Sequence, residues 1–261
     1  MGRILLGVFL AIACTTALDA SGYTAFSALP LIPLFALLAM LGRIPRAELG
    51  LRTGPFSSYV AALAHPIIVC SVLVALAVGA HAVDFSAFDA SKAVRNVALM
   101  AAATFVLAII TEEGFFRGWL WAALGRQHAP PLIILGATTA AFVLWHVSWV
   151  YLSGDFHFGT AQIPLFFVNA TLLGLIWGLL RLGSGSIIVS SAGHGLWNGM
   201  AYVLFGVGSN VGALGIRNLA LYGPEVGLFG ALLNAGFAGL LLFLLRSQLG
   251  TLRAGELAPS D

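Results

Sequence analysis

The chain has 261 residues, of which 60% are hydrophobic and only 8% are charged, with a formal net charge of +2. Soluble domains carry about 25% charged residues, so this composition excludes an ordinary soluble protein. Disorder is excluded as well, because disordered chains combine low hydrophobicity with high charge. The small net charge provides no field that would attract nucleic acid, so we expect no nucleic-acid partner. The composition predicts an all-α, polytopic integral membrane protein.

The apolar residues occur in long continuous runs, which is typical of membrane helices and not of the alternating strands of a barrel. A helix needs about 20 mostly apolar residues to cross a bilayer. We therefore expect residues 1–261 to form a single transmembrane domain of about eight helices in contact with the lipid bilayer. The predicted spans are 4–20, 25–42, 58–80, 93–112, 131–152, 162–181, 185–207 and 226–246.

The orientation of the spans is predicted from the lysines and arginines of short loops, because cytoplasmic loops carry the excess of them. With eight spans, both termini lie on the same side as the 43–57 loop, and the 81–92 loop lies on the other side with Lys92, Arg95 and Arg217. The first side is predicted to be cytoplasmic, in a plasma or inner membrane. Its arginines are Arg3, Arg43, Arg46, Arg52, Arg117, Arg126, Arg181, Arg246 and Arg253.

The first group of ionisable residues that calls for explanation follows the fourth apolar run. A charge inside a membrane is costly unless it is paired or hydrated, so such residues indicate function. Glu113 and Arg117 are four residues apart and can pair on one helix face, whereas Glu112 lies about 100° around the helix. No proline interrupts residues 93–124, which predicts one continuous helix. The alternative is a solvated helix start with an ordinary salt bridge.

Two further spans carry polar side chains. His146 lies among apolar residues in the fifth span, where a hydrogen-bonded structural histidine is the alternative to a functional one. His194 and Asn198 are four residues apart in the seventh span and share one helix face. Asparagine can also simply hold membrane helices together. We expect Glu112, His146, His194 and Asn198 to line one cavity, because burying each of them alone would be unfavourable.

Glycines flank two of these polar groups. Gly114 and Gly118 lie beside Glu113 and Arg117, and Gly195 and Gly199 lie beside His194 and Asn198. Small residues four positions apart let membrane helices approach closely, so packing is their expected role. Close packing at these points would bring the polar side chains of different helices within reach of one another.

Together, the polar side chains can carry out hydrolysis. A glutamate can take a proton from water as a general base, and a histidine can position that water. A histidine and an asparagine on one face can donate to a developing oxyanion, while Arg117 holds Glu113 ionised. Cys14 and Cys70 lie in apolar runs without metal spacing. No cofactor is favoured; the alternative is zinc, which two histidines and one carboxylate can ligate, here Glu112, His146 and His194.

The three groups form motifs in a fixed order: Glu-Glu-x-x-x-Arg at 112–117, Phe-x-x-x-His at 142–146 and His-x-x-x-Asn at 194–198. This set, on three separate helices, resembles the CPBP family of type II CAAX prenyl endopeptidases and proteins linked to bacteriocin self-immunity. The resemblance implies an intramembrane endopeptidase with eight helices. It also implies that Glu112 activates water with the help of His146, and that His194 and Asn198 are oxyanion donors. Members have also been described as metal-dependent.

The leading hypothesis is an intramembrane endopeptidase that cuts a membrane peptide or a lipidated protein from the cytoplasmic half of the bilayer. A second is a noncatalytic bacteriocin-immunity or scaffold protein that retains the motifs for structural reasons. A third is a small transporter whose buried carboxylates relay protons, and it ranks last because no inverted repeat is evident. Glu112→Gln separates enzyme from scaffold, because it should remove catalysis and preserve the fold.

Overall fold

The computed structural model describes residues 1–154, 159–208 and 210–250 and is mostly helical. Two segments are π-helical, η2 (Glu113–Leu120) and η3 (Ala201–Phe205), and one short turn, η1 (Thr24–Phe26), is a 3-10 helix. The strands β1 (Gly206–Val207) and β2 (Asn210–Val211) pair as an antiparallel hairpin. The α-helices are α1 (Gly2–Ala20), α2 (Leu31–Leu41), α3 (Phe56–Gly79), α4 (Ala90–Ile110), α5 (Trp121–Gly125), α6 (Pro131–Trp145), α7 (Val147–Leu152), α8 (Gln162–Ser184), α9 (Ile187–Met200), α10 (Leu219–Tyr222), α11 (Leu228–Leu244) and α12 (Arg246–Gly250).

The all-α prediction is confirmed, and helices lie in all eight ranges predicted as spans. Six helical segments of the described chain are long and apolar enough to cross a membrane. The ranges 185–207 and 226–246 differ, because α9 changes to π-helical geometry at Ala201 and α11 has only 17 residues. A helix of that length spans about 25 Å, less than the hydrocarbon core of about 30 Å. The count of eight crossings therefore stays a prediction.

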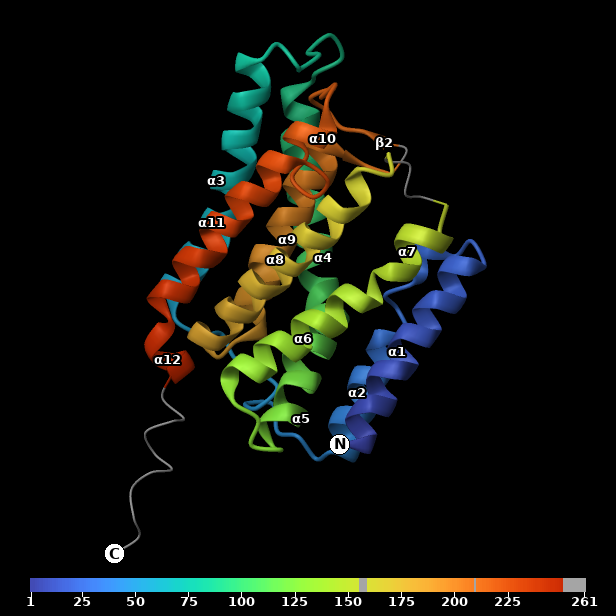
Figure 1. The fold of residues 1–261 in the computed structure, drawn as a ribbon, viewed down its shortest axis with the longest axis vertical. Helices are drawn as coiled ribbons and strands as arrows, with labels where there is room; N and C mark the ends of the chain where they lie inside the picture. Colours follow the sequence, from blue (N-terminus) through green and yellow to red (C-terminus); the bar gives the residue numbers. More distant parts are fainter. Residues whose placement is uncertain (155–158, 209, 251–261) are drawn as a thin grey trace, which may run out of the picture.

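Helices α8 and α9 form the centre of the molecule. More than half of the residues in each are buried, and α9 packs against α4 and α3 while α8 packs against α6 and α11 (Figure 1). On the other side of this centre, α1 contacts α6 and α7, and α2 contacts η2. Polar groups carried by α8, α9 and η2 are consequently enclosed by apolar helices.

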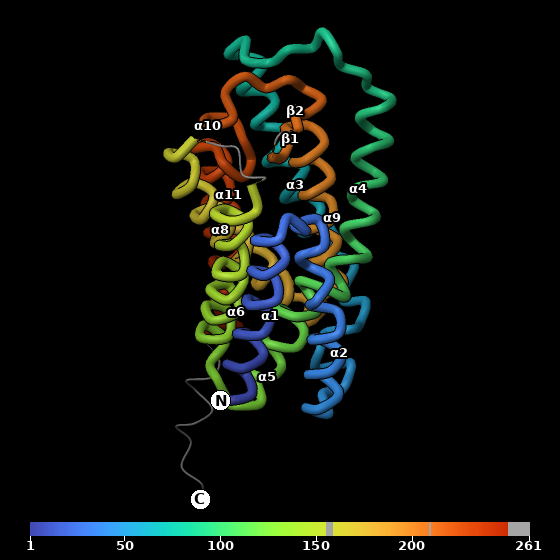
Figure 2. The backbone as a smooth tube through the Cα atoms, turned by 90° about the vertical axis from the view of Figure 1, so that its right-hand side faces the viewer, coloured from blue at the N-terminus to red at the C-terminus, as the bar shows by residue number. Residues whose placement is uncertain are grey.

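The molecule has two distinct ends (Figures 1 and 2). The N-terminus and α5 lie at one end, and so does the 42–55 loop, because Arg126 after α5 donates to Gly42 O at 2.7 Å and pairs with Glu48. We call this the terminal end. The 80–89 loop, the β1–β2 hairpin and α10 lie at the opposite end, which we call the hairpin end. Arg253, assigned to the cytoplasmic side above, lies outside the described residues.

A tight turn fixes where α9 begins. Gly185 ends α8 with φ +66°, a left-handed conformation that glycine adopts without strain. Ser186 then caps α9, because its Oγ accepts from the backbone N–H groups of Ile188 and Val189. Arg52 donates to Gly185 O at 2.8 Å and ties this turn to the 42–55 loop. The turn therefore sets the height in the bilayer at which α9 presents its polar residues.

The glycines of α9 allow its backbone to touch that of α4. A Cβ atom added to Gly195 would lie 2.7 Å from Ala101 O and 2.8 Å from Phe105 N. A Cβ atom added to Gly199 would lie 2.8 Å from Val97 O. The packing role expected for this glycine pair is confirmed.

We expect Gly195→Ala to lower the free energy of unfolding by about 1–3 kcal/mol, because the added methyl group overpacks the contact between α9 and α4. Thermal unfolding of the purified protein in detergent measures the loss. Gly236→Ala on α11 is the control, since a Cβ there meets nothing within 4 Å, and it should be neutral or stabilising. Equal stability of both variants would contradict the close contact.

Candidate active site

The first motif lies where the helical geometry of the fourth span changes. Thr111 adopts φ −112° and ψ −104°, so α4 ends at Ile110 and the π-helical η2 begins at Glu113. The chain stays helical over residues 90–125, as predicted for 93–124, but its helical geometry changes at this point. A π-helix closes its hydrogen bonds over one more residue than an α-helix, and such segments are frequent at functional sites. Here the change of geometry falls between Glu112 and the two motif residues that follow it in η2.

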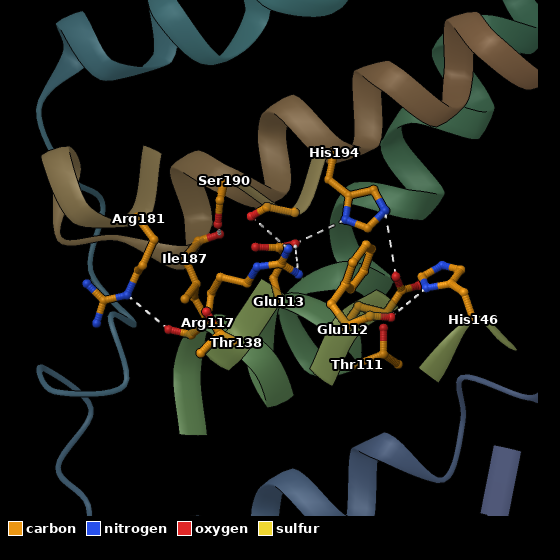
Figure 3. A network of polar contacts seen from close by, with 12 residues as sticks. Thr111, Glu112, Glu113, Arg117, Thr138, His146, Arg181, Ile187, Ser190 and His194 are labelled. Atoms are coloured by element: carbon orange, nitrogen blue, oxygen red, sulfur yellow. Dashed lines mark hydrogen bonds and ion pairs between the residues drawn. The ribbon is translucent and has the colours of Figure 1, made fainter. Parts of the chain in front are cut away.

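Glu113 and Arg117 form a fully buried ion pair. Arg117 Nη1 lies 3.2 Å from Glu113 Oε1, and both side chains have 0% exposure. The pairing expected from their spacing is confirmed. Glu113 Oε1 also accepts from His194 Nδ1 at 3.2 Å, which joins η2 to α9 (Figure 3). One carboxylate therefore holds both an arginine of its own helical segment and a histidine of another helix.

Arg117 is also fixed by α8. Its Nη2 donates to Gly174 O at 3.2 Å, and its guanidinium lies 4.3 Å from the centroid of the Phe142 ring. Arg181 donates from Nε to Arg117 O at 3.1 Å. Arg117 and Arg181 are 0% and 6% exposed, so counting them among the loop charges was wrong. Their side chains hold helices together inside the protein.

The plane of the His194 ring is set by Trp177. The two rings are stacked, with centroids 3.8 Å apart and an angle of 10° between planes. Because Glu113 accepts at Nδ1, that nitrogen carries a hydrogen, and the opposite nitrogen, Nε2, lies 3.9 Å from Glu112 Oε2. Figure 3 shows the Glu112 carboxylate between the rings of His194 and His146.

His146 lies between α6 and α7, at the point where the fifth span is interrupted. Its Nδ1 lies 2.8 Å from Phe142 O, one turn earlier. A carbonyl oxygen only accepts, so Nδ1 carries a hydrogen, and in the neutral ring Nε2 is the free acceptor. The phenylalanine of the second motif thus orients the histidine twice, through its carbonyl and through its ring, whose centroid lies 4.5 Å from that of the imidazole.

All four residues that were expected to meet line one cavity of about 470 Å³, namely Glu112, His146, His194 and Asn198. Their clustering is confirmed. Glu113 and Arg117 do not line it and instead lie behind His194. Aromatic side chains form much of the remaining wall: Phe142, Trp145, Trp149, Phe166, Trp177 and Tyr202. The cavity combines a few polar groups with apolar walls, as ligand sites commonly do.

Two carboxylates in the lining were not found by sequence analysis. Glu225, in the loop before α11, accepts from Trp197 Nε1 at 2.9 Å. Asp19, at the end of α1, is 1% exposed and accepts from Ser148 Oγ at 2.6 Å. Each stands at the edge of an apolar run, which reads as an ordinary span boundary. The sequence does carry one indication: neither Asp19 nor Glu225 has a basic residue within four positions that could pair with it on the same helix.

The zinc alternative requires Glu112, His146 and His194 to converge on one point. Within the part of the chain that the structure describes, no three His, Cys, Asp or Glu side chains form a group that could hold a metal ion. His194 Nδ1 donates to Glu113, and its Nε2 lies 3.9 Å from the nearest Glu112 oxygen. A carboxylate that accepts from the other ring nitrogen is also common behind a zinc-ligating histidine, so these contacts do not decide between the two versions of the site. We derive no role for a metal from this geometry.

Comparison with known proteins agrees with the motifs. Residues 94–200 match the Rce1-like type II CAAX prenyl endopeptidase family. The matched range contains all three motifs and is consistent with the CPBP resemblance. No curated protein and no solved structure matches the chain. The match, together with the long apolar helices, identifies an integral membrane protein related to a family of proteases.

Glu113→Gln and Arg117→Ala should each lower the free energy of unfolding by about 3–5 kcal/mol, because each leaves a buried charge without its partner. Glu112→Gln should preserve stability, since Glu112 faces the cavity and only approaches His194 at 3.9 Å. Thermal unfolding in detergent compares the three variants. Equal losses at all three positions would show that the whole motif is structural.

Glu225 should make stability depend on pH. The residue lies in a loop outside the membrane-spanning helices, and burial raises its pKa from 4.5 to about 7. The native state then holds this proton more tightly than the unfolded state does, so stability falls as the pH rises from 4.5 to about 7. Glu225→Gln should melt higher than the wild type at pH 8 and lack this decline. The same decline in both proteins would contradict the assignment.

Proposed function

We propose that the protein is an intramembrane endopeptidase that hydrolyses a peptide bond in a membrane-associated or lipidated peptide or protein. The observation that carries the proposal is the position of the Glu112 carboxylate, between two imidazoles in the wall of a cavity. The family match over residues 94–200 supports the same reaction class.

Glu112 is the general base. It takes a proton from a water molecule in the cavity, and the resulting hydroxide attacks the carbonyl carbon of the scissile bond. His146 positions this water, because its neutral ring donates from Nδ1 to Phe142 O and leaves Nε2 to accept from the water. Its position next to Glu113 supports this role, because neighbouring residues of a helix point about 100° apart, so Glu112 lines the cavity while Glu113 pairs with Arg117.

His194 and Asn198 stabilise the oxyanion that forms on attack. They lie one turn apart on α9 and both line the cavity. Since Nδ1 of His194 already donates to Glu113, its Nε2 can donate to the substrate only when the ring is doubly protonated. Glu113 therefore acts as a positioning residue, and Arg117 acts in turn through Glu113.

Collapse of the tetrahedral intermediate completes the reaction. The carbon–nitrogen bond breaks, and the proton that Glu112 took from water passes to the departing amine. The products are a peptide with a new carboxyl terminus and one with a new amino terminus. Glu112 is then ionised again, so the cycle consumes one water molecule and needs no other reactant.

Comparing the peptides that accumulate in membranes holding the wild type or Glu112→Gln tests this proposal. The variant should leave its substrate uncut, while the control Glu48→Gln, an exposed glutamate paired with Arg126, should behave like the wild type. On a peptide found in this way, Asn198→Ala should reduce turnover about 10²–10³-fold, as loss of an oxyanion donor does.

Identical peptides in all membranes would favour the noncatalytic immunity or scaffold protein. Activity that disappears on chelation and returns with stoichiometric zinc would favour the metal-dependent version of the protease.

A further inference from the structure

One carboxylate of the cavity wall has no role in the mechanism proposed above. Glu225 lies in the loop between α10 and α11 and lines the same cavity as Glu112 and Asn198. The residue is partly exposed, whereas its neighbours Pro224 and Val226 are buried. Burial nevertheless raises the pKa of Glu225, which is expected of a side chain at the wall of an internal cavity.

A chain of buried polar side chains holds Glu225 in place. Trp197 Nε1 donates to Glu225 Oε1 at 2.9 Å, and the Trp197 ring stacks on that of His65 with their centroids 4.9 Å apart. His65 Nε2 lies 2.9 Å from Asn234 Oδ1, and Asn234 Nδ2 donates to Asn169 Oδ1 at 2.9 Å. These four supporting residues come from α3, α8, α9 and α11, and each has 0% exposure.

This chain does more than join helices. Asparagines alone can hold membrane helices together, and Asn169 and Asn234 do so here. The chain continues through His65 and Trp197, however, and ends on a carboxylate at the cavity. Four buried side chains therefore fix the position of one acidic group beside the proposed catalytic residues.

Glu225 has no positively charged partner among the residues that the structure describes. Their ion pairs do not include it, and His194, which can carry a positive charge, pairs with Glu112 and Glu113 instead. Trp197 is its one hydrogen-bond donor there, and it contacts only Oε1. The titratable side chains that interact electrostatically with Glu225 are those of Glu112, His194, Tyr202 and Cys70.

An ionised carboxylate in such a place is unfavourable unless a cation or further donors compensate for its charge. We propose that Glu225 binds a positively charged side chain of the substrate, a lysine or an arginine, close to the scissile bond. Such a side chain supplies the missing charge and the missing donors together. Proximity to the scissile bond follows because Trp197, which holds Glu225, directly precedes Asn198 on α9. The term substrate rests on the function proposed above, but the binding of a cation does not.

Thermal unfolding with three small probes tests the cation site without any knowledge of the substrate. n-Butylammonium and n-butylguanidinium represent the ends of lysine and arginine side chains, and N-butylurea is a neutral analogue of the second. Each is added at the same concentration and ionic strength to the purified protein in detergent at pH 8. A compound that binds the native state and not the unfolded state raises the melting temperature.

We expect at least one of the two cations to raise the melting temperature of the wild type by about 2–4 °C more than N-butylurea does. At pH 5 this excess should be lost, because Glu225 has a pKa of about 7 and is then protonated. Glu225→Gln keeps an acceptor for Trp197 and removes the charge, so it should lose the excess at pH 8. The control Glu48→Gln, at an exposed glutamate, should retain it.

Equal shifts with the cations and with N-butylurea in the wild type would overturn the proposal. An undiminished excess in Glu225→Gln would overturn it too, because the cation would then bind elsewhere. Where that variant does not fold, the wild type decides, since an excess of the same size at pH 5 and pH 8 excludes Glu225. None of these measurements needs catalysis, so this site and the endopeptidase activity can each fail while the other holds.

Discussion

The structure depends on one buried carboxylate. Glu113 lies without exposure in the centre of a helical membrane protein, where a lone charge would be very unfavourable, and its Oε1 accepts from Arg117 and His194. Arg117 in turn donates to the backbone of α8, and Arg181 of α8 donates back to Arg117 O. Three helical segments are thereby held in one arrangement. The catalytic proposal requires this rigidity, because a general base and an oxyanion donor act only in fixed positions.

Much of this could be predicted because the relevant signals are local. Apolar run length indicates helices, and a spacing of four residues pairs Glu113 with Arg117 and places His194 beside Asn198. The π-helical geometry after Thr111 could not be predicted, because an i→i+5 pattern is chosen by the packing around it. The contacts of Glu225 with Trp197 and of Asp19 with Ser148 could not be predicted either, because the residues of these pairs lie 28 and 129 positions apart in the sequence.

The arginine count shows a different kind of limit on sequence reasoning. Sequence position could not distinguish the exposed Arg126 from Arg117 and Arg181, which serve as internal cross-links. The loop charges alone also say nothing about where a cavity opens.

The charge of the cavity wall bears on what happens after cleavage. The lining contains the carboxyl groups of Asp19, Glu112 and Glu225, and none of its described residues is a lysine or arginine. Hydrolysis creates a new carboxylate next to Glu112, and like charges at such short range repel one another strongly in a poorly solvated space. The proposed mechanism also places His194 and Asn198 as donors beside the same carboxylate, so release of the fragment with the new carboxyl terminus depends on the balance between this repulsion and those donors.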